Sequence, residues 1–492
     1  MTYSLAMERL ALGLAVTALA GCNSGDATAR PDAAVPDAAP VAPDARTGGA
    51  FRAGFLWGGA TAAYQAESAA PPATDWSVWE TLAGKIAHGD RSAAGPDEWD
   101  HYDADFALAQ SMGHNAYRFS IEWARIEPTP GVFDEAAIGH YQAVIASLKA
   151  HGLRPVVTLW HFTNPTWVQD PSGGPSLGGW EATATADAYV SFVSRIVPRF
   201  SDDVDFWITL NEPMVYVIQG YFFGIWPPGH SVDEANAVIV HNHLIDAHVR
   251  AYDAIHAHYR SKSKPVTVTI ASHFVAFDPA TPNDADATQK LEHIVDYAFL
   301  DAIVKGDVDT TLDGTAVVHR DDYANHLDVI GLNYYQRQIV MTVPIGIVPG
   351  IPGPDPNAAL KSDLGWELYP AGMGRALDGL WSRYQVPMVI TENGIADAAD
   401  KYRSWYIVTH LQEVQSALQR GVDVRGYLHW ALIDNFEWAE GLAPRFGLVA
   451  VDYDAAVRTR TVRTSAGALT DIIHVGEVTP DIVARWGVQP TP

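Results

Sequence analysis

Cysteine is almost absent from this sequence: its 492 residues include one, Cys22. A single thiol excludes an intrachain disulfide, and it also excludes a zinc site built on two or more thiolates. Unbroken apolar runs of about 20 residues, which a transmembrane helix requires, are absent as well. The fold must therefore be held together by side-chain packing rather than by disulfides or thiolate-bound zinc.

Positive charge is also scarce. The sequence has 32 Lys plus Arg against 58 Asp plus Glu, a formal net charge of −26. Nucleic-acid binding needs a basic face for the phosphates, so this balance argues against a nucleic-acid partner. Charged residues make up 18% of the chain, whereas hydrophobic residues make up 48%. Such a composition can bury a large core and excludes disorder for most of the chain.

The first 50 residues differ from the rest. An apolar run over residues 10–20 follows Arg9 and is too short to span a bilayer, which indicates a signal peptide over residues 1–21. The run ends in Leu19-Ala20-Gly21-Cys22, which resembles the lipobox of bacterial lipoproteins, where the cysteine receives the lipid. Residues 22–50 then form a linker of Ala, Pro and Asp without aromatic residues, which has nothing to pack.

These features predict an exported protein that is tethered through a lipidated Cys22 and contacts the membrane only through that anchor. The location they favour is a bacterial outer membrane or cell surface rather than the free periplasm. A buried structural thiol is the alternative, but the one cysteine falls where a lipobox needs it. Starts at Met1 and at Met7 both fit, since Glu8 weakens the basic segment before the apolar run.

The body of the chain alternates between short apolar or β-branched runs and longer segments with helical spacing. Eight such runs begin near Phe55, Asn115, Pro155, Phe206, Val266, Val329, Pro387 and Val424. Helix-like segments cover residues 136–151, 185–200, 235–258, 287–305 and 402–420. Eight units predict an α/β fold, a single (β/α)8 TIM barrel with long loops over residues 51–475, followed by a tail over residues 476–492. A doubly wound sheet is the alternative, but no Gly-x-Gly-x-x-Gly turn follows the first run.

Polar residues stand where these runs end, which is where a barrel of this kind gathers its active site. The set comprises Gln65, Glu67, Arg118, His161, Asn211, Glu212, Asn333, Tyr335, Glu392, Asn393 and Trp430. Glu212 and Glu392 each follow an apolar strand directly, and two carboxylates facing each other across a barrel mouth can cleave a glycosidic bond by acid–base and nucleophilic chemistry. Either glutamate alone could equally be a solvated residue at a strand end.

The motifs around these residues resemble glycoside hydrolase family 1, the retaining β-glycosidases, from Phe55 to about Tyr453. The matching segments are Phe55-Leu56-Trp57-Gly58, Ala63-Tyr64-Gln65, Tyr117-Arg118-Phe119-Ser120, Asn211-Glu212-Pro213, Gly331-Leu332-Asn333-Tyr334-Tyr335, Thr391-Glu392-Asn393-Gly394, His429-Trp430 and Asp434-Asn435-Phe436-Glu437-Trp438. The resemblance implies an O-glycosyl hydrolase, most readily a β-glucosidase, that acts on non-reducing terminal β-D-glycosides and needs no cofactor.

The resemblance also implies roles for individual residues. Glu392 would be the nucleophile that forms a glycosyl-enzyme ester, and Glu212 would protonate the leaving oxygen and then activate water. Arg118 and the hydroxyl of Tyr335 would favour the charged form of Glu392. A structural salt bridge is the alternative role for Arg118.

Substrate contacts follow from the same resemblance. Residues implied to bind sugar hydroxyl groups are Gln65, His161, Asn211, Asn333 and Glu437, with Asn211 directed at the 2-OH, and Tyr335 is implied to contact the substrate as well. Trp430 would be a stacking floor and Trp438 would close the pocket, although most of the 16 tryptophans must serve the core. Phe162 stands where many members carry Trp, so it keeps an apolar wall but loses an N–H donor. Residues 339–363 are expected to form a long loop over the mouth that, with Trp366, contacts the aglycone.

Three other functions fit parts of this pattern. A 6-phospho-β-glycosidase would need a cationic site near Glu437, and a carboxylate there repels a dianion. A transglycosidase would use the same residues with another acceptor. A surface carbohydrate-binding protein that has lost catalysis would be expected to lack one of the glutamates. The choice among glucose, galactose and fucose stays open, as does the oligomeric state.

Closely spaced histidines are the remaining candidates for a metal site. His241, His243 and His248 fall on one predicted helix, as do His256 and His258. Residues two apart on a helix point to different faces, and no carboxylate triad accompanies either pair, so these histidines are interpreted as packing or surface residues without metal. A Ser-His-Asp site is not supported either, since no Gly-x-Ser-x-Gly segment is present.

Overall fold

The computed structural model describes residues 51–343 and 349–491, so the predicted signal peptide, Cys22 and the linker lie outside the described residues. In the described part, eight parallel strands close into a barrel through the pairing of β8 with β10. Around the barrel they are β1 (Leu56–Ala60), β2 (Ala116–Ser120), β3 (Arg154–Thr158), β4 (Phe206–Asn211), β5 (Thr267–Pro279), β8 (Ile330–Met341), β10 (Met388–Asn393) and β11 (Val424–Trp430). The predicted (β/α)8 barrel is confirmed, and every strand starts within one residue of its predicted position.

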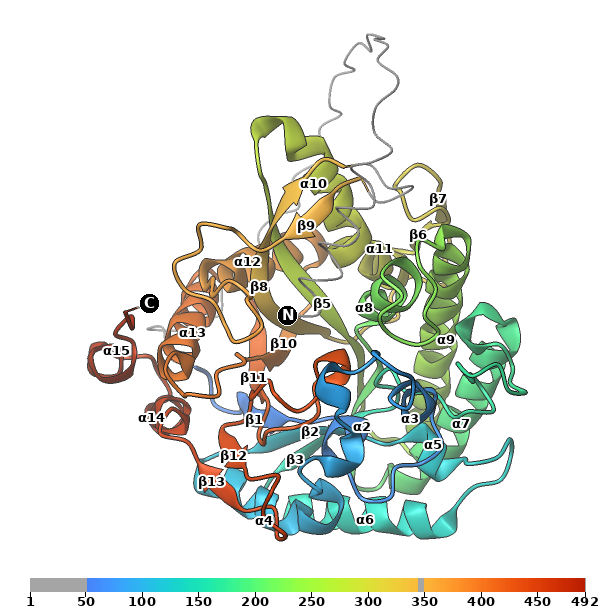
Figure 1. Ribbon diagram of the computed structural model, residues 1–492, viewed down its shortest axis with the longest axis horizontal. Helices are drawn as coiled ribbons and strands as arrows, with labels where there is room; N and C mark the ends of the chain where they lie inside the picture. The colour runs from blue at the N-terminus through green and yellow to red at the C-terminus, as the bar shows by residue number, and fades with distance from the viewer. Residues whose placement is uncertain (1–50, 344–348, 492) are drawn as a thin grey trace. The chain divides into compact units, whose positions relative to one another are not determined.

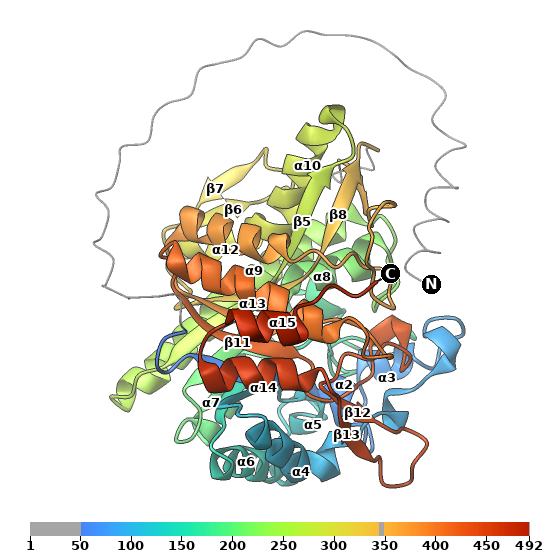
Figure 2. The same ribbon diagram turned by 90° about the vertical axis from the view of Figure 1, so that its left-hand side faces the viewer.

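Helices surround the strands (Figures 1 and 2). The long ones are α4 (Glu98–Ser111), α6 (Glu135–Ala150), α7 (Thr183–Phe200), α9 (Glu234–Ser261), α12 (Ala371–Tyr384), α13 (Arg403–Gln419) and α14 (Ala466–Val475). Aspartate caps fix two of the starts: Asp134 accepts from the first turn of α6 and Asp233 from that of α9. The predicted helices at these positions are confirmed with small shifts of their ends.

The helix predicted over residues 287–305 is interrupted. The structure has α10 (Ala285–Glu292) and α11 (Ala298–Leu300), each followed by a π-helical turn, η6 (His293–Tyr297) and η7 (Asp301–Lys305). Side chains at these turns reach other elements: His293 Nε2 lies 2.8 Å from Asp309 Oδ2, and Arg383 Nε donates to Asp301 Oδ1 at 2.9 Å. Wide turns of this kind re-aim the side chains that follow.

Strands β5 and β8 extend past the barrel as a paired ribbon. Their pairing continues from Ala276 with Arg337 to Pro279 with Val340, and β9 (Ile351–Gly353) adds an antiparallel strand to β8. The prediction of one loop over residues 339–363 was therefore wrong at residues 339–341 and 351–353, while residues 344–348 lie outside the described residues. The antiparallel pairing of Ile339 with Gly353 and of Met341 with Ile351, which depends on two segments meeting in space, explains the difference.

Most of the shorter elements lie in the loops that follow barrel strands, and two short paired strands instead precede β8. They are α2 (Ala63–Ala66), α3 (Asp75–Trp79), α5 (Trp123–Ile126), α8 (Pro213–Val217), β6 (Asp307–Asp309), β7 (Val317–His319), β12 (Val449–Val451), β13 (Arg460–Val462), η1 (Ala87–Gly89), η2 (Ser92–Ala94), η3 (Gly179–Glu181), η4 (Ile218–Phe222), η5 (Pro282–Asp284) and η8 (Trp438–Glu440). The capping box between Thr74 and Ser77 begins α3. The loops that follow the strands build the rim of the barrel mouth.

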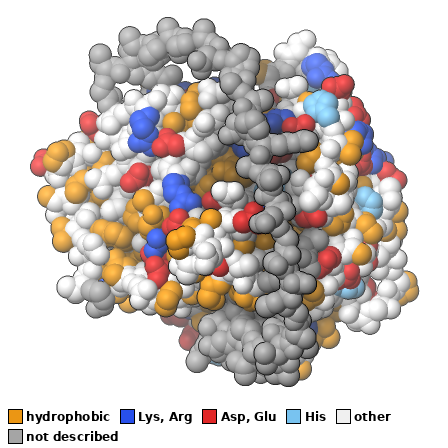
Figure 3. All heavy atoms as spheres, turned by 90° about the horizontal axis from the view of Figure 1, so that it is seen from above, with side chains coloured by type: hydrophobic (Ala, Val, Ile, Leu, Met, Phe, Trp, Pro, Cys, Tyr) orange, Lys and Arg blue, Asp and Glu red, His pale blue; other side chains and the backbone are white. Residues whose placement is uncertain are grey.

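The predicted tail over residues 476–492 contains a helix, α15 (Pro480–Trp486), which Thr479 caps. Ile482 is buried, and Trp486 Nε1 donates to Asp471 of α14 at 2.7 Å. Across the described ranges, no helix is both long and apolar enough for a membrane span. On the face shown in Figure 3, outside the grey atoms, Lys and Arg side chains are interspersed with acidic ones.

Candidate active site

Apolar side chains from successive strands fill the barrel interior. They come from alternate strand positions, because neighbouring side chains of a strand point to opposite faces. The set is Ala116, Val156, Phe206, Ile208, Ala271, Val329, Val389 and Leu428, with Leu56 packed against them. Two residues further along their strands stand Arg118, Thr158, His273, Thr391 and Trp430. A mainly polar layer therefore covers an apolar plug at the C-terminal edge of the strands, where this fold places active sites.

Arg118 lies at the centre of this layer and has no exposed surface. Its guanidinium donates to Glu392 Oε1 at 2.5 Å, to Asn211 Oδ1 at 2.6 Å and to the carbonyl of Thr391 at 3.2 Å. Its Nε donates to Thr158 Oγ1 at 3.1 Å. These contacts use a rigid fork of donors to join strands β2, β3, β4 and β10.

Glu392 is the last residue but one of β10, and the residue is 4% exposed. One oxygen accepts from Arg118, and the other accepts from the Tyr335 hydroxyl at 2.5 Å. Burial raises the pKa of Glu392 to about 7; Arg118 lowers the pKa, the charge of Glu212 raises it, and the Tyr335 hydrogen bond lowers it. Arg118 thus acts in the predicted direction, but burial outweighs it.

Glu212 follows β4 directly and begins the turn into α8. Its backbone adopts the left-handed conformation with φ 43°, and its N–H donates to the carbonyl of Ala271 at 2.7 Å. Such a conformation is costly for a residue with a side chain and persists where its surroundings hold it. Its Oε1 accepts from Asn333 Nδ2 at 2.8 Å and lies 3.3 Å from His273 Nδ1.

Gln65, Trp430 and Glu437 form a second polar group beside the carboxyl pair. The Trp430 indole donates to Glu437 Oε1 at 3.3 Å, and Gln65 Nε2 lies 3.4 Å from Glu437 Oε2. Gln65 Oε1 is buried without a hydrogen-bond partner. Burial raises the pKa of Glu437 to about 8; the Trp430 hydrogen bond lowers this pKa, and the charge of Glu392 raises it. The group therefore presents a partly buried carboxyl and a buried amide oxygen without a hydrogen-bond partner.

Aromatic rings surround His161. Its ring lies nearly parallel to Trp430 at 6.0 Å and to Trp438 at 6.1 Å, with interplanar angles of 16° and 13°. Phe162 packs edge-on against Trp438 at 5.3 Å and Trp226 at 4.8 Å. Burial and the charge of Arg118 lower the pKa of His161 well below its usual range, so its imidazole is neutral. This wall combines apolar ring faces with a neutral imidazole, which suits a sugar ring.

Trp366 lies at the edge of the site. Its ring is half-buried and packs against Tyr335 at 5.7 Å and Phe446 at 6.2 Å. The next residue, Glu367, accepts two hydrogen bonds from Arg337 on β8, of 2.7 and 2.8 Å. Trp366 is thus fixed beside the residue that donates to Glu392.

The structure brings the predicted site residues together into one network. Asn211 Nδ2 lies 3.2 Å from His161 Nε2, and Thr391 Oγ1 donates to Asn333 Oδ1 at 2.7 Å. Glu67, which also follows the first strand, instead faces Arg125, whose Nε lies 2.6 Å from its Oε2. The histidines on α9 are not part of this network: His248 Nδ1 lies 2.7 Å from Thr209 Oγ1, and His243 Nδ1 lies 2.8 Å from the Trp180 carbonyl.

Sequence reasoning missed Trp226 and His273. Trp226 is buried and packs against Trp76 at 5.4 Å as well as against Phe162 and Trp438. His273 was overlooked because β5 runs on for 13 residues, so no strand end marks it. The alternation after Ala271 is the signal that could have identified it.

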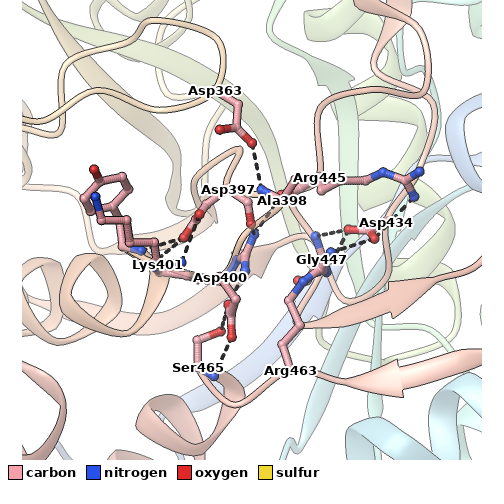
Figure 4. Close-up of polar contacts among 12 residues, drawn as sticks. Asp363, Asp397, Ala398, Asp400, Lys401, Asp434, Arg445, Gly447, Arg463 and Ser465 are labelled. Carbon is pink, nitrogen blue, oxygen red and sulfur yellow. Dashed lines mark hydrogen bonds and ion pairs between the residues drawn. The ribbon is translucent and has the colours of Figure 1, made fainter. Parts of the chain in front are cut away.

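A charged network supports the site from outside (Figure 4). Asp434 accepts two hydrogen bonds of 2.9 Å from Arg463 and one of 3.0 Å from the Gly447 N–H. Asp397 accepts from the first residues of α13, and Arg403 donates to the Asp397 carbonyl at 2.7 Å. The network ties the loops that follow Glu392 and precede Glu437 to the C-terminal segment.

No metal is needed to explain these contacts. Over residues 51–343 and 349–491, no group of three or more His, Cys, Asp and Glu side chains could hold a metal ion. What the site offers is a pair of buried carboxyls, one guanidinium and an aromatic wall. Such an arrangement can transfer a proton and attack carbon at one bond.

Comparison with known proteins agrees with this chemistry. Residues 47–477 match the family described as Glycosyl hydrolase family 1. A β-galactosidase of Saccharolobus solfataricus is 35% identical, covering 87% of this chain and 98% of its own length. Beta-glucosidase A of Thermotoga maritima is 33% identical, with coverages of 83% and 94%.

A solved structure of a β-glycosidase from Pyrococcus horikoshii superposes with a TM-score of 0.80 and 33% identity, covering 89% of this chain and 98% of that one. The match over nearly the whole described barrel, together with the paired carboxyls at its mouth, settles the family. The chain belongs to glycosyl hydrolase family 1 and is an O-glycosyl hydrolase.

Proposed function

We propose that the chain is a retaining, exo-acting β-glycosidase in which Glu392 is the nucleophile and Glu212 the general acid and base. The observation that carries this assignment is the unequal support of the two carboxyls. Arg118 and Tyr335 each donate to a different oxygen of Glu392, which favours the ionised form that attacks carbon. Glu212 is held through Oε1 by Asn333, which directs its other oxygen to the substrate.

The reaction takes two displacements. In the first, a Glu392 oxygen attacks the anomeric carbon while the Glu212 proton moves to the glycosidic oxygen, so the C–O bond breaks and a glycosyl ester forms. In the second, Glu212 takes a proton from water, the water oxygen attacks the same carbon, and the ester bond breaks to release Glu392. Two inversions give retained anomeric configuration.

The sugar lies against the aromatic wall and the polar group beside it. Gln65, His161, Asn211 and Asn333 supply hydrogen-bonding groups for the hydroxyls, as does Glu437, and Trp430 and Trp438 supply ring faces. The free Oε1 of Gln65 is available as an acceptor. Trp366, beside Tyr335, is assigned to the aglycone.

For the glycone we propose β-D-glucosides first and β-D-galactosides second. One relative is named a β-glucosidase and another a β-galactosidase, so both sugars are candidates. A 6-phosphoglucoside is disfavoured because its phosphate would need a cationic site near Glu437, whereas the side chains that contact Glu437 there, Trp430 and Gln65, carry no positive charge.

The test is hydrolysis of nitrophenyl β-glycosides by the full chain, with glucoside, galactoside, fucoside and 6-phosphoglucoside compared. Glu392→Ala should abolish turnover, and added azide should restore it with an α-glycosyl azide as product. Glu212→Ala is the matched control, because azide should then yield the β-glycosyl azide from the intermediate. Sugar binding without turnover of any glycoside would favour a binding protein, and transfer to added alcohols would favour a transglycosidase.

We also propose that the mature protein is lipid-anchored through Cys22 at an outer membrane or cell surface. The support is the lipobox-like Leu19-Ala20-Gly21-Cys22 segment and the linker that follows it. Cys22→Ser should move the protein from the membrane fraction to the soluble fraction of the expressing cells. Unchanged membrane association would contradict the anchor.

A further inference from the structure

His273 contacts Glu212, yet the proposed reaction assigns it no role. It pairs in register with Asn333 of β8, and Ala271, two residues before it on the same face, belongs to the apolar plug. The alternation of β5 therefore points His273 into the mouth. Its side chain is 16% exposed, so it faces the site rather than bulk solvent.

His273 contacts Glu212 directly and is linked to Glu392 through Tyr335. Its Nδ1 lies 3.3 Å from Glu212 Oε1, the oxygen to which Asn333 also donates at 2.8 Å. Its ring lies 6.3 Å from that of Tyr335 at an interplanar angle of 29°, and Tyr335 donates to Glu392. The titratable groups that face the imidazole are thus Glu212 at the end of β4 and Tyr335 on β8, with Glu392 of β10 behind Tyr335.

The demand for this donor changes during the reaction. Protonated Glu212 needs few donors, but once it has given its proton to the leaving group it becomes a carboxylate, whose Oε1 faces Asn333 and His273. A hydrogen bond to an ionised group is roughly twice as strong as one between neutral groups. A donor at Oε1 also leaves Oε2 to carry the proton.

We propose that His273 is a positioning residue for Glu212: its Nδ1–H donates to Oε1, fixes the carboxyl together with Asn333, and stabilises the carboxylate that takes a proton from water. The inference rests on the proposed role of Glu212 as acid and base. It adds that the second displacement depends on His273 more than the first.

The test uses two substitutions with opposite expectations. His273→Asn places an amide N–H where Nδ1 stands, whereas His273→Leu removes the donor and keeps comparable bulk. With dinitrophenyl β-glucoside, whose leaving group needs no proton, turnover reports the second displacement. We expect His273→Leu to lower kcat about tenfold and His273→Asn to stay within about threefold of the native enzyme, as expected for one charge-assisted hydrogen bond.

A pH profile separates this role from a structural one. Loss of a donor to the carboxylate favours its protonated form, so the basic limb of kcat/KM for nitrophenyl glucoside should move to higher pH in His273→Leu and stay in place in His273→Asn. The double variant with Glu212→Ala should be no slower than Glu212→Ala alone, because His273 acts through Glu212. If His273→Leu does not fold, as judged by its thermal unfolding, His273→Gln replaces it, since its amide lies at the Nε2 position.

Equal kcat in the native enzyme and His273→Leu, with an unmoved basic limb, would overturn the proposal, as would equal impairment by Asn and Leu. Failure of the underlying function has a different signature: Glu212→Ala would then keep full activity on substrates with poor leaving groups and would form no β-glycosyl azide.

Discussion

The hydroxyl of Tyr335 is the contact whose removal has the most direct chemical consequence. It donates to Glu392 Oε2 at 2.5 Å, and Tyr335→Phe deletes this donor while keeping the ring that packs against Trp366. Tyr334→Phe is the matched control, because the Tyr334 hydroxyl donates to the Tyr369 carbonyl at 2.7 Å, outside the site.

The magnitude follows from the charge state of Glu392. Burial raises the pKa of Glu392 to about 7, and the Tyr335 hydrogen bond lowers it, so losing that bond must raise this pKa further. A hydrogen bond to a charged group contributes about 1.5 kcal/mol at the low end, which corresponds to about one pH unit. Glu392 attacks only when ionised, so the acid limb of activity should move to higher pH by about one unit.

The assay is kcat/KM for nitrophenyl β-glucoside from pH 5 to pH 9. Tyr335→Phe should shift the acid limb upward by about one pH unit and lower the plateau, whereas Tyr334→Phe should leave the limb in place. An acid limb that stays in place or moves to lower pH in Tyr335→Phe would refute the electrostatic account of Glu392.

Two further predictions concern stability. Burial, followed by the charge of Asp105, raises the pKa of Glu98 to about 8, above its unfolded value, so its contribution to stability is present below the unfolded pKa and is lost as pH rises through about 8. Tm should therefore fall as pH rises from about 5 to about 8 and level off above that, and Glu98→Gln should flatten that fall; an unchanged slope would contradict it. Asp434→Ala leaves the guanidinium of Arg463, which is 9% exposed, without its main partner and should cost about 3–5 kcal/mol in urea unfolding. Glu135→Ala, which breaks an exposed pair, is the control and should leave unfolding unchanged; equal effects of the two substitutions would argue against the network.

The barrel could be predicted because parallel strands buried on both faces read as continuous apolar runs, and these runs end in polar residues at one edge. Glu212 and Glu392 were candidates for that reason, since each directly follows such a run, and the resemblance of the surrounding motifs to a known family singled them out. His273 was not, because β5 continues through Pro279 without a break and hides the point where the barrel ends.

Two other properties depend on three-dimensional context. The ribbon of β5, β8 and β9 forms by pairing between strands, which a Pro- and Gly-rich segment does not reveal locally. The charge state of Glu392 depends on how completely the loops enclose it. Arg118 was correctly expected to favour its ionised form, yet burial, which no sequence pattern measures, is the larger effect.

The central claim is that Glu392 attacks the sugar. The most direct measurement is to incubate the protein with dinitrophenyl 2-deoxy-2-fluoro-β-glucoside, whose intermediate is slow to hydrolyse, and to locate the added mass by peptide mapping. The account predicts one fluoroglucosyl group on the peptide that contains Thr391-Glu392-Asn393, none in Glu392→Ala, and slow recovery of activity once the reagent is removed. A label on another residue, or turnover of a good substrate with no covalent intermediate and an inverted product, would contradict it.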